Sequence, residues 1–222
     1  MPRVADHEER RHQVATAVGR IIAAEGLNAV TVAKTAAEAG ISVGLVQHYF
    51  RSKDEMLLFT YGYVLERIER RVSDLIERSE AVGARVEHIV LDGLAEYMPL
   101  DEQRRQEWRV ALAFTGRAAD DPRLGATKAA ALGRTRALLA QAITNAQECG
   151  EVPESADVAK EAARIAAYAD GLTAHHFADP AGLPADAVLA ALGDHLATVF
   201  TGECRLRGRS PGERPAASPE PS

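Results

Sequence analysis

The twenty residues from Thr31 to Phe50 constrain the fold most, because they encode two short helices joined by a tight turn. Threonine at position 31 is a residue type that caps a helix by accepting a backbone N–H bond. Gly40 stands where a helix end favours a left-handed residue, and Ser42 can cap a second helix. Two helices joined by such a turn form the helix-turn-helix unit, whose second helix enters the major groove of DNA.

The second helix of this unit is predicted to run from Val43 to about Phe50 and to contact DNA. Glutamine can make paired hydrogen bonds to adenine, whereas serine, tyrosine and histidine more often meet phosphate. Lysine at the start of the next helix can also meet phosphate, helped by the positive end of the helix dipole. The predicted DNA-contacting residues are Thr31, Ser42, Val43, Gly44, Leu45, Gln47, His48, Tyr49 and Lys53.

The first helix of the pair is predicted to bury one apolar face made of Val32, Ala33, Ala36 and Ala37. Taken alone, this pattern also fits an ordinary buried hairpin, because alanine-rich helical hairpins with a glycine turn are common. The flanking residues therefore decide between a DNA-binding unit and a purely structural one.

The flanking residues extend the unit into a longer ordered pattern. The pattern comprises Thr31-Val32, Ala36-Ala37, Gly40-Ile41-Ser42-Val43-Gly44 and Tyr49-Phe50-Arg51-Ser52-Lys53-Asp54-Glu55-Met56-Leu57. It resembles the DNA-binding signature of the TetR family of transcriptional repressors. The resemblance implies an all-helical homodimer with an N-terminal DNA-binding domain and a C-terminal domain for ligand binding and dimerisation. The chain departs from it at Gln47, where many members carry tyrosine, so their phosphate contact is not implied here.

A competing interpretation comes from Gly40-Ile41-Ser42-Val43-Gly44, which also satisfies the G-x-S-x-G nucleophile elbow of serine hydrolases. The elbow needs a buried strand that leads into Ser42, but the preceding residues spell an alanine-rich helix. A hydrolase of that fold also needs about eight strands alternating with helices, and the sequence predicts none. A hydrolase acting through Ser42 is therefore the alternative, and we predict that the protein is not an enzyme.

The formal charge of −6 is unusual for a protein that binds DNA, but its distribution explains it. In residues 1–55, seven Lys and Arg balance seven Asp and Glu, so the net negative charge lies in the rest of the chain. A neutral head with a few basic residues fits a dimer that relies on placed phosphate contacts. Such binding is expected to weaken markedly as salt rises.

The sequence predicts a cytoplasmic chain without cofactor, metal site or membrane contact. Cys149 and Cys204 lie far apart with no spacing motif, which is typical of reduced, cytoplasmic proteins. His7 and His12 resemble a zinc motif, but their spacing is one residue too long. No apolar stretch approaches the ~20 residues that span a bilayer, and the first residues lack the apolar core of a signal peptide.

Apolar periodicity and helix breakers predict an all-α fold of about nine helices. A supporting helix from about Glu8 to Glu25 precedes the helix-turn-helix, and a capping box at Ser52 and Glu55 opens a long connecting helix. Five more helices are predicted at roughly Ala84–Tyr97, Glu102–Ala118, Pro122–Cys149, Ser155–Phe177 and Ala185–Thr201. We expect a DNA-binding domain at 1–52, a ligand-binding and dimerisation domain at 53–202, and a disordered tail at 203–222.

The C-terminal domain has a looser likeness of its own. Trp108 and Phe114, Asp121-Pro122, and Asp170-Gly171-Leu172 before His175-His176 resemble the TetR branch that includes the choline-responsive betaine repressor. Ligand sites of helical proteins lie between helices, so the effector, an unknown small molecule, is expected among the middle ones. The candidate ligand-binding residues are His88, Tyr97, Met98, Trp108, Phe114 and Tyr168. Asp92, Glu96 and Glu107 would favour a cationic ligand if they faced inward.

The last two predicted helices carry apolar stripes that we assign to a dimer interface. Two such helices from each subunit can form a four-helix bundle. The predicted interface residues are Ile165, Ala169, Leu172, His176, Val188, Leu192, His195 and Val199. In the alternative, both stripes face only the core of their own subunit.

Together these patterns predict a ligand-responsive repressor that binds a palindromic DNA operator as a homodimer. The DNA-binding domains of two subunits fit successive major grooves only at a separation of roughly 34–36 Å or a multiple of it. A ligand that prefers a conformation with another separation would therefore release the DNA.

Overall fold

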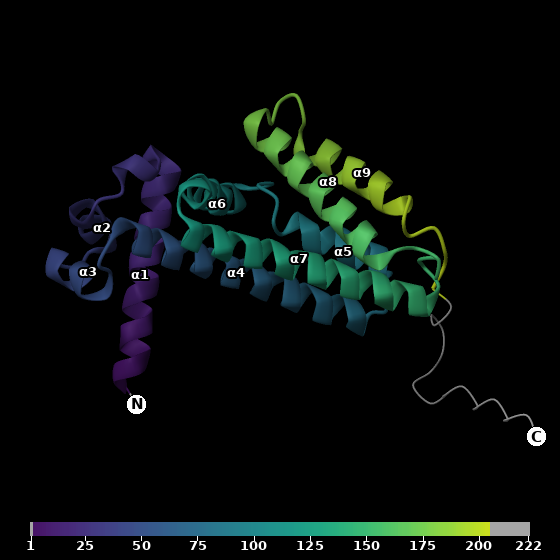
Figure 1. Cartoon of the computed structure of the whole chain (residues 1–222), viewed down its shortest axis with the longest axis horizontal. Helices are drawn as coiled ribbons and strands as arrows, with labels where there is room; N and C mark the ends of the chain where they lie inside the picture. Colours follow the sequence, from purple (N-terminus) through teal and green to yellow (C-terminus); the bar gives the residue numbers. More distant parts are fainter. Residues whose placement is uncertain (1, 205–222) are drawn as a thin grey trace, which may run out of the picture.

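The computed structural model describes the backbone of residues 2–204 and the side chains of residues 7–204. This part of the chain folds into nine α-helices and one short 3-10 helix, without a strand (Figure 1). The helices are α1 (Pro2–Glu25), α2 (Val32–Ala39), α3 (Val43–Tyr49), α4 (Lys53–Ala81), α5 (Val86–Ala95), α6 (Glu102–Asp120), α7 (Pro122–Cys149), α8 (Val158–Ala178) and α9 (Ala185–Ala197). The all-α prediction is confirmed, whereas most of the predicted tail lies outside the described residues.

Helix boundaries follow local capping chemistry. Asp121 caps α7 by accepting a hydrogen bond from the Arg123 N–H, and Pro122 occupies the first turn, where its missing N–H costs nothing. Gly150 ends the same helix with a left-handed φ of 92°. The main difference is at α1, which begins at Pro2 instead of Glu8, because the prediction relied on an apolar pattern that starts only further along.

The buried face of α2 differs from the predicted one. Thr35, Ala36 and Ala39 are buried, whereas Ala33 and Ala37 are exposed. The helix packs against α1, where the Gln13 side chain donates a 2.7 Å hydrogen bond to the carbonyl of Ala39. Of the predicted face, Ala36 is buried and Val32 packs against the core, so the prediction is correct in part.

The first hydrophobic core joins the three N-terminal helices to α4, α6 and α7. Its residues on α1 include Val14, Val18 and Ile21, and its centre is a parallel stack of the Tyr61 and Phe114 rings with centroids 4.0 Å apart. Helix α1 packs against both α4 and α6. The α2–α3 end of the molecule is therefore not separated from the following helices by a break in the core.

The second core is built by α5, α7, α8 and α9, and it holds most of the residues predicted for the dimer interface. Ile165, Ala169, Val188, Leu192 and Val199 are at most 8% exposed within the single subunit. These stripes thus face their own subunit, as the alternative interpretation held. Periodicity identifies an apolar stripe but cannot tell what covers it.

Two histidines and a leucine complete the predicted interface set. His176 is buried, and its ring nitrogens lie 2.8 Å from the Leu183 carbonyl and 3.3 Å from the Pro99 carbonyl. Leu172 and His195 are partly buried. The internal hydrogen bonds of His176 explain why it is turned away from the surface.

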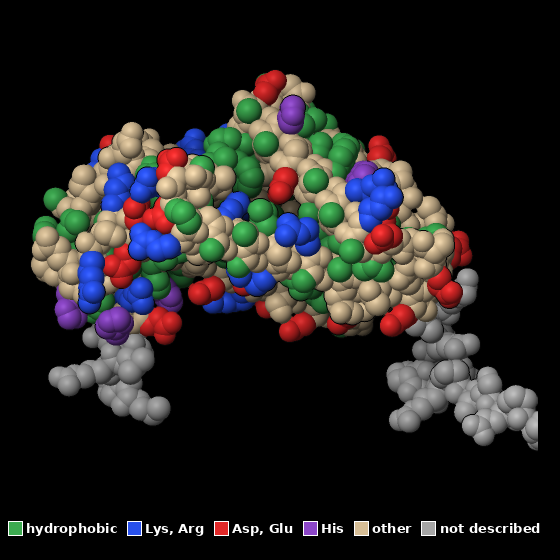
Figure 2. All heavy atoms as spheres, viewed as in Figure 1, with side chains coloured by type: hydrophobic (Ala, Val, Ile, Leu, Met, Phe, Trp, Pro, Cys, Tyr) green, Lys and Arg blue, Asp and Glu red, His purple; other side chains and the backbone are tan. Residues whose placement is uncertain are grey.

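The outer face of α8 carries small side chains instead. Its exposed residues include Ala163, Ala167, Gly171, Ala174 and Ala178. Apolar side chains reach the surface over α8 and α9 in Figure 2. Close approach of another helix is possible here, since small residues let backbones come together.

The long helices set the shape of the molecule. Helices α4 and α7 run along it, α2 and α3 lie at one end, and α8 and α9 cover one side near the other end (Figure 1). Among the described helices, none combines the length and the apolar character that crossing a membrane requires.

Candidate nucleic-acid interface and effector cavity

The turn between α2 and α3 has the geometry that the sequence predicts. The Thr31 hydroxyl accepts a 3.1 Å hydrogen bond from the Lys34 N–H and so caps α2. Gly40 has φ 66° and ψ 32°, a left-handed conformation that costs glycine little. The N–H groups of Gly40 and Ile41 donate to the carbonyls at the end of α2, at 3.2 and 3.0 Å. The turn is therefore a fully hydrogen-bonded helix end.

Helix α3 is anchored from one side only. Ser42 caps it by accepting a 3.2 Å hydrogen bond from the Leu45 N–H. Val46 is fully buried and Phe50 is 2% exposed, so both hold the helix against the core. Gln47 and His48 are exposed on the outer side. A helix presented in this way is free to enter a groove of DNA.

The predicted DNA-contacting residues lie together at the α2–α3 end of the molecule (Figure 1). Most of them are exposed: Thr31, Ser42, Val43, Gly44, Gln47 and His48. Leu45, Tyr49 and Lys53 are partly buried. The Tyr49 ring stands edge-on to the ring of His7, with centroids 4.7 Å apart, which ties the end of α3 to α1.

The capping hydroxyls of Thr31 and Ser42 can still donate a hydrogen bond. Each oxygen accepts a backbone N–H, so its own proton remains available to a phosphate oxygen. The caps that shape the unit can therefore also orient donors toward DNA.

The turn between α3 and α4 contains the predicted capping box in a shifted form. Ser52 accepts a 3.1 Å bond from the Glu55 N–H, as predicted. The Glu55 carboxylate accepts a 2.7 Å bond from the N–H of Arg51, one residue earlier than the usual motif. Lys53 follows the cap directly, with its backbone at the positive end of α4.

The basic residues of this end are partly neutralised by ion pairs. Lys34 pairs with Glu25, and Arg20 lies 3.6 Å from Glu38. Lys53 makes no ion pair with the side chains of residues 7–204. Figure 2 shows Lys and Arg side chains mixed with acidic ones over this end, with histidines at its edge. The surface is charged without being uniformly basic.

The surroundings of Ser42 do not form a nucleophile elbow. Its hydroxyl caps a helix, the preceding Gly40 ends another helix, and residues 2–204 contain no strand. The elbow requires a strand that turns sharply into a helix at the serine. The hydrolase alternative therefore lacks its structural basis.

A cavity of about 460 Å³ lies between the middle helices. Side chains from α4, α6, α7 and α8 and from the segment after α5 form its walls. They are Tyr61, Val64, Leu65, Ile68, Glu69, Leu94, Glu96, Tyr97, Met98, Arg104, Glu107, Trp108, Ala111, Lys128, Ala131, Leu132, Thr135, Arg136, Ala163, Ala166, Ala167, Ala169, Asp170 and Thr173. The cavity size suits a small molecule.

The structure divides the six predicted ligand-binding residues into two groups of three. Tyr97, Met98 and Trp108 line the cavity, whereas the other three do not. Phe114 is fully buried under Tyr61, and Tyr168 stacks on His195 with centroids 4.2 Å apart. His88 is exposed on α5. Residue type alone did not reveal which side of each helix faces the cavity.

The acidic groups that would attract a cation are already neutralised. Arg71 binds the carboxylate of Glu107 through two nitrogens at 3.1 and 2.8 Å. The same guanidinium donates a 2.7 Å bond to Glu96, and Asp92 is exposed away from the cavity. Sequence reasoning missed this arginine because it lies among many charged residues of α4.

Several polar groups of the cavity remain available to a ligand. The Trp108 Nε1–H is buried and has no hydrogen-bond partner among the residues whose side chains the structure describes. Burial lowers the pKa of Lys128, and the charge of Asp170 partly offsets this shift. Burial raises the pKa of Tyr61 to about 12, so its phenol stays protonated. A ligand with a hydrogen-bond acceptor would satisfy these donors.

Lys128 and Asp170 were not among the predicted site residues, although a sequence signal exists. Lys128 stands four residues after Leu124 and three before Ala131, both of which are buried. Lysine is rarely found on the buried stripe of a helix. A cavity that also contains other polar side chains accounts for its position here. Asp170 similarly follows Ala169 directly, so it lies at the edge of a buried stripe.

Helix α6 connects the cavity with the DNA-binding end. Trp108 and Ala111 face the cavity, while the residues between them face α1. Arg109 donates a hydrogen bond to the carbonyl of Ala23, and Val110 packs beside Gly19. A ligand that displaces α6 would therefore also displace α1, the helix that supports α2 and α3.

The comparisons with known proteins match both halves of the chain. Residues 17–58 match the family described as bacterial regulatory proteins of the tetR family. Residues 83–201 match the C-terminal domain of BetI-type transcriptional repressors.

Individual relatives agree over nearly the whole length. The HTH-type transcriptional regulator PksA of Bacillus subtilis (strain 168) is 31% identical over 206 residues, covering 92% of this chain and 97% of PksA. The regulator BetI of Brucella anthropi is 25% identical over 203 residues, covering 91% of this chain and 100% of BetI. A solved transcriptional regulator from Rhodococcus sp. Rha1 has a TM-score of 0.74 and 29% identity, covering 86% of this chain and 96% of that chain.

These matches agree with the geometry of the α2–α3 turn and with the all-helical C-terminal part. They give no support to a hydrolase. The chain belongs to the TetR family of bacterial transcriptional regulators, as its helix-turn-helix signature predicted.

Proposed function

We propose that this protein is a repressor that binds a near-palindromic operator as a homodimer and releases it when a small molecule enters the cavity. Members of the family bind operators and effectors, typically as dimers, and BetI-type proteins are repressors. The observation that carries the proposal is the position of α6, which contacts the cavity with one face and α1 with the other.

The operator would be read by α3. Gln47 and His48 are exposed on its outer side, where they can reach base edges in a major groove. Thr31, Ser42 and Lys53 border this helix and offer hydroxyl and ammonium donors to the flanking phosphates. Val43, which is 44% exposed, offers methyl groups to a thymine.

The dimer would form through the exposed faces of α8 and α9. The small, exposed residues Gly171, Ala174 and Ala178 do not line the cavity, and they give α8 a face that a partner helix can approach closely. A two-fold interface of this kind fixes the separation of the two α3 helices. Operator binding then depends on that separation, and an effector needs only to favour another one.

The effector is inferred to be largely apolar with one acceptor group. Apolar and aromatic side chains dominate the cavity wall, and its carboxylates at positions 96 and 107 are paired with Arg71. The unpartnered Trp108 N–H and the ammonium of Lys128 call for an acceptor, such as a carbonyl or carboxylate oxygen. A difference in affinity of ~100-fold between two conformations corresponds to about 2.7 kcal/mol, which a few such contacts supply. Because bacterial operators lie on DNA in the cytoplasm, we propose that the protein acts there.

The test is binding of the purified protein to DNA fragments that flank its own coding region, with footprinting at two salt concentrations. A protected palindrome whose affinity falls steeply with salt is the expected result. If a random-sequence selection also yields no bound duplex above background, the proposal is overturned. Compounds with an apolar body and a carboxylate can then be screened for release of the bound DNA.

A further inference from the structure

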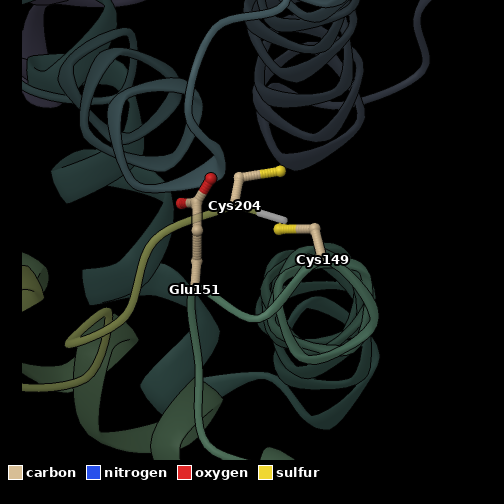
Figure 3. A group of neighbouring side chains, drawn as sticks. All are labelled: Cys149, Glu151 and Cys204. Carbon is tan, nitrogen blue, oxygen red and sulfur yellow. The ribbon is translucent and has the colours of Figure 1, made fainter. Parts of the chain in front are cut away.

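The only two cysteines of the chain meet at the end of the molecule opposite α2 and α3. Cys149 is the last residue of α7, and Cys204 follows α9. Together with Glu151 they form a cluster in which one sulfur from each cysteine and one carboxylate oxygen all lie within 4.8 Å of one another. Figure 3 shows the three side chains, which come from two segments far apart in the sequence.

The backbone around the cluster is held tightly. Gly150 reverses the chain after Cys149, and the N–H of Gly202 donates a 2.9 Å hydrogen bond to the Glu151 carbonyl. A side chain at position 202 would collide with the Gly150 carbonyl, since its Cβ would lie 2.1 Å from that oxygen. Arg85 also donates a 3.1 Å bond to the carbonyl of Gly202. The segment that carries Cys204 is therefore fixed against the end of α7.

Hydrogen bonds also hold the Glu151 side chain in one orientation. It is 1% exposed, and its two oxygens accept 3.2 Å hydrogen bonds from the N–H groups of Val86 and Glu87 at the start of α5. The Arg85 guanidinium lies 3.7 Å away and balances its charge. A carboxylate has about four lone-pair positions, so these contacts leave it able to bind a further partner.

We propose that Cys149, Glu151 and Cys204 form a binding site for a thiophilic divalent cation, with Zn²⁺ as the best match. Two sulfurs and one carboxylate oxygen are ligands that Zn²⁺ takes in tetrahedral sites. Cys204 is only partly buried, which leaves room for water as the fourth ligand. On binding, the two thiols release two protons to the solvent and form two metal–sulfur bonds, so the net charge of the site is unchanged.

The buried carboxylate is the reason to favour a metal over a disulfide. A disulfide would involve the two sulfurs alone, whereas a metal ion would also be bound by the Glu151 oxygen that lies within 4.8 Å of both sulfurs. Three donors of this type on a rigid backbone instead preform most of a coordination shell. Sequence reasoning did not identify the site, because the two cysteines do not follow a metal-binding spacing and only the fold brings them together. None of its three residues lines the cavity or belongs to α2 or α3.

Cobalt is the appropriate probe for the full-length protein, reduced beforehand with a phosphine. Tetrahedral Co²⁺ has strong visible bands, and thiolate ligands add a charge-transfer band in the near ultraviolet. Because the chain has only two cysteines, that band reports this site alone. We expect one Co²⁺ per chain with both features, displacement by Zn²⁺, and a higher unfolding temperature in Zn²⁺ than in a chelator.

Variants make the test specific. Cys149→Ser and Cys204→Ser should each weaken cobalt binding by about 100-fold and lower the charge-transfer intensity per bound cobalt to roughly half, because one thiolate remains. Glu151→Gln keeps an acceptor for the start of α5 but loses the ligand charge, so binding should weaken by about 10-fold with both thiolates still bound. The double cysteine variant is the control for weak binding by histidines, and circular dichroism checks that each variant is folded.

Two results would overturn the proposal. One is the absence of a thiolate-to-cobalt band in the reduced wild-type protein. The other is equal cobalt affinity of the wild type and the double cysteine variant. If air oxidation instead removes both free thiols and lowers the mass by two hydrogens while no metal is bound under reducing conditions, the cluster is a disulfide pair.

Discussion

Arg117 and Asp54 join the end of α6 to the beginning of α4 through two parallel hydrogen bonds. Nε of the arginine lies 3.0 Å from Oδ1 of the aspartate, and Nη2 lies 2.7 Å from Oδ2. Asp54 directly follows Lys53, the proposed phosphate contact. The pair therefore links the helix that lines the effector cavity to the edge of the DNA-binding end.

Breaking this pair should reduce the response to an effector more than it reduces the stability of the fold. In Arg117→Met, we expect the effector concentration needed for DNA release to rise about 5-fold, because α6 loses one of its attachments. Both side chains are about one-third exposed and screened by solvent, so the loss of stability should be small. DNA release by an active compound, followed by fluorescence anisotropy, measures the effect. Arg164→Met, which removes an exposed pair on α8, is the matched control.

The same pair predicts a specific dependence of stability on pH. The hydrogen bond from Arg117 holds the pKa of Asp54 below its usual value of 3.8. A carboxyl group with a lowered pKa stabilises the folded state above its unfolded pKa of about 3.9, and this contribution is lost as the pH falls through the folded value. Urea unfolding of the wild type and Asp54→Asn should therefore differ most above pH ~4 and converge below it. A constant difference across that range would contradict the prediction.

Replacing residues on the outer side of α3 should affect operator recognition without affecting the fold. Gln47→Ala is expected to cost about 1–3 kcal/mol of specific binding, since a paired contact to a base would be lost. His48→Ala should also weaken specific binding, while the dimer stays intact in both. Gln141→Ala, an exposed position on α7, is the control. Unchanged operator affinity in both α3 variants would refute the assignment of the reading helix.

Lys53→Ala should weaken binding to all DNA sequences about equally. A phosphate contact carries no sequence information, and its loss should lower the slope of log K against log salt by about 1. Arg78→Ala, exposed near the C-terminal end of α4, should leave the slope unchanged. A change in base preference in Lys53→Ala would mean that this lysine contacts a base instead.

The single tryptophan of the chain offers a direct readout of the cavity. Trp108 lines it, so a compound that releases the DNA should change the intensity or wavelength of tryptophan emission over the same concentration range. Trp108→Phe keeps an aromatic ring but loses the unpartnered N–H, and we expect about 10-fold weaker release by the same compound. Equal release by both proteins would place the effector elsewhere.

The helix-turn-helix could be predicted from the sequence because its determinants are local. Thr31, Ser42 and Ser52 each make the capping bond that their positions imply, and Gly40 is left-handed as expected. Each of these features depends on a few neighbouring residues. Tertiary packing does not alter them.

Features that depend on what each face of a helix packs against were predicted less well. Val188 and Leu192 form an apolar stripe, but that stripe covers the core of its own subunit instead of a partner. Phe114 lies under Tyr61 although Trp108, on the same helix, lines the cavity. Periodicity gives the angular spacing of residues but no information on what each face meets, which is decided by packing between distant elements.

The alternation of contacts along α6 also limits how this protein can evolve. Trp108 and Ala111 meet the cavity, while Arg109 and Val110, which lie between them, hold α1. Substitutions of Trp108 and Ala111 that suit a new effector would leave the contacts with α1 intact. Substitutions of Arg109 and Val110 would also shift α1 and the helices that it supports. If the cavity binds the proposed effector, neighbouring positions of one helix serve two separate functions, and a descendant could respond to a new effector while it keeps the same operator.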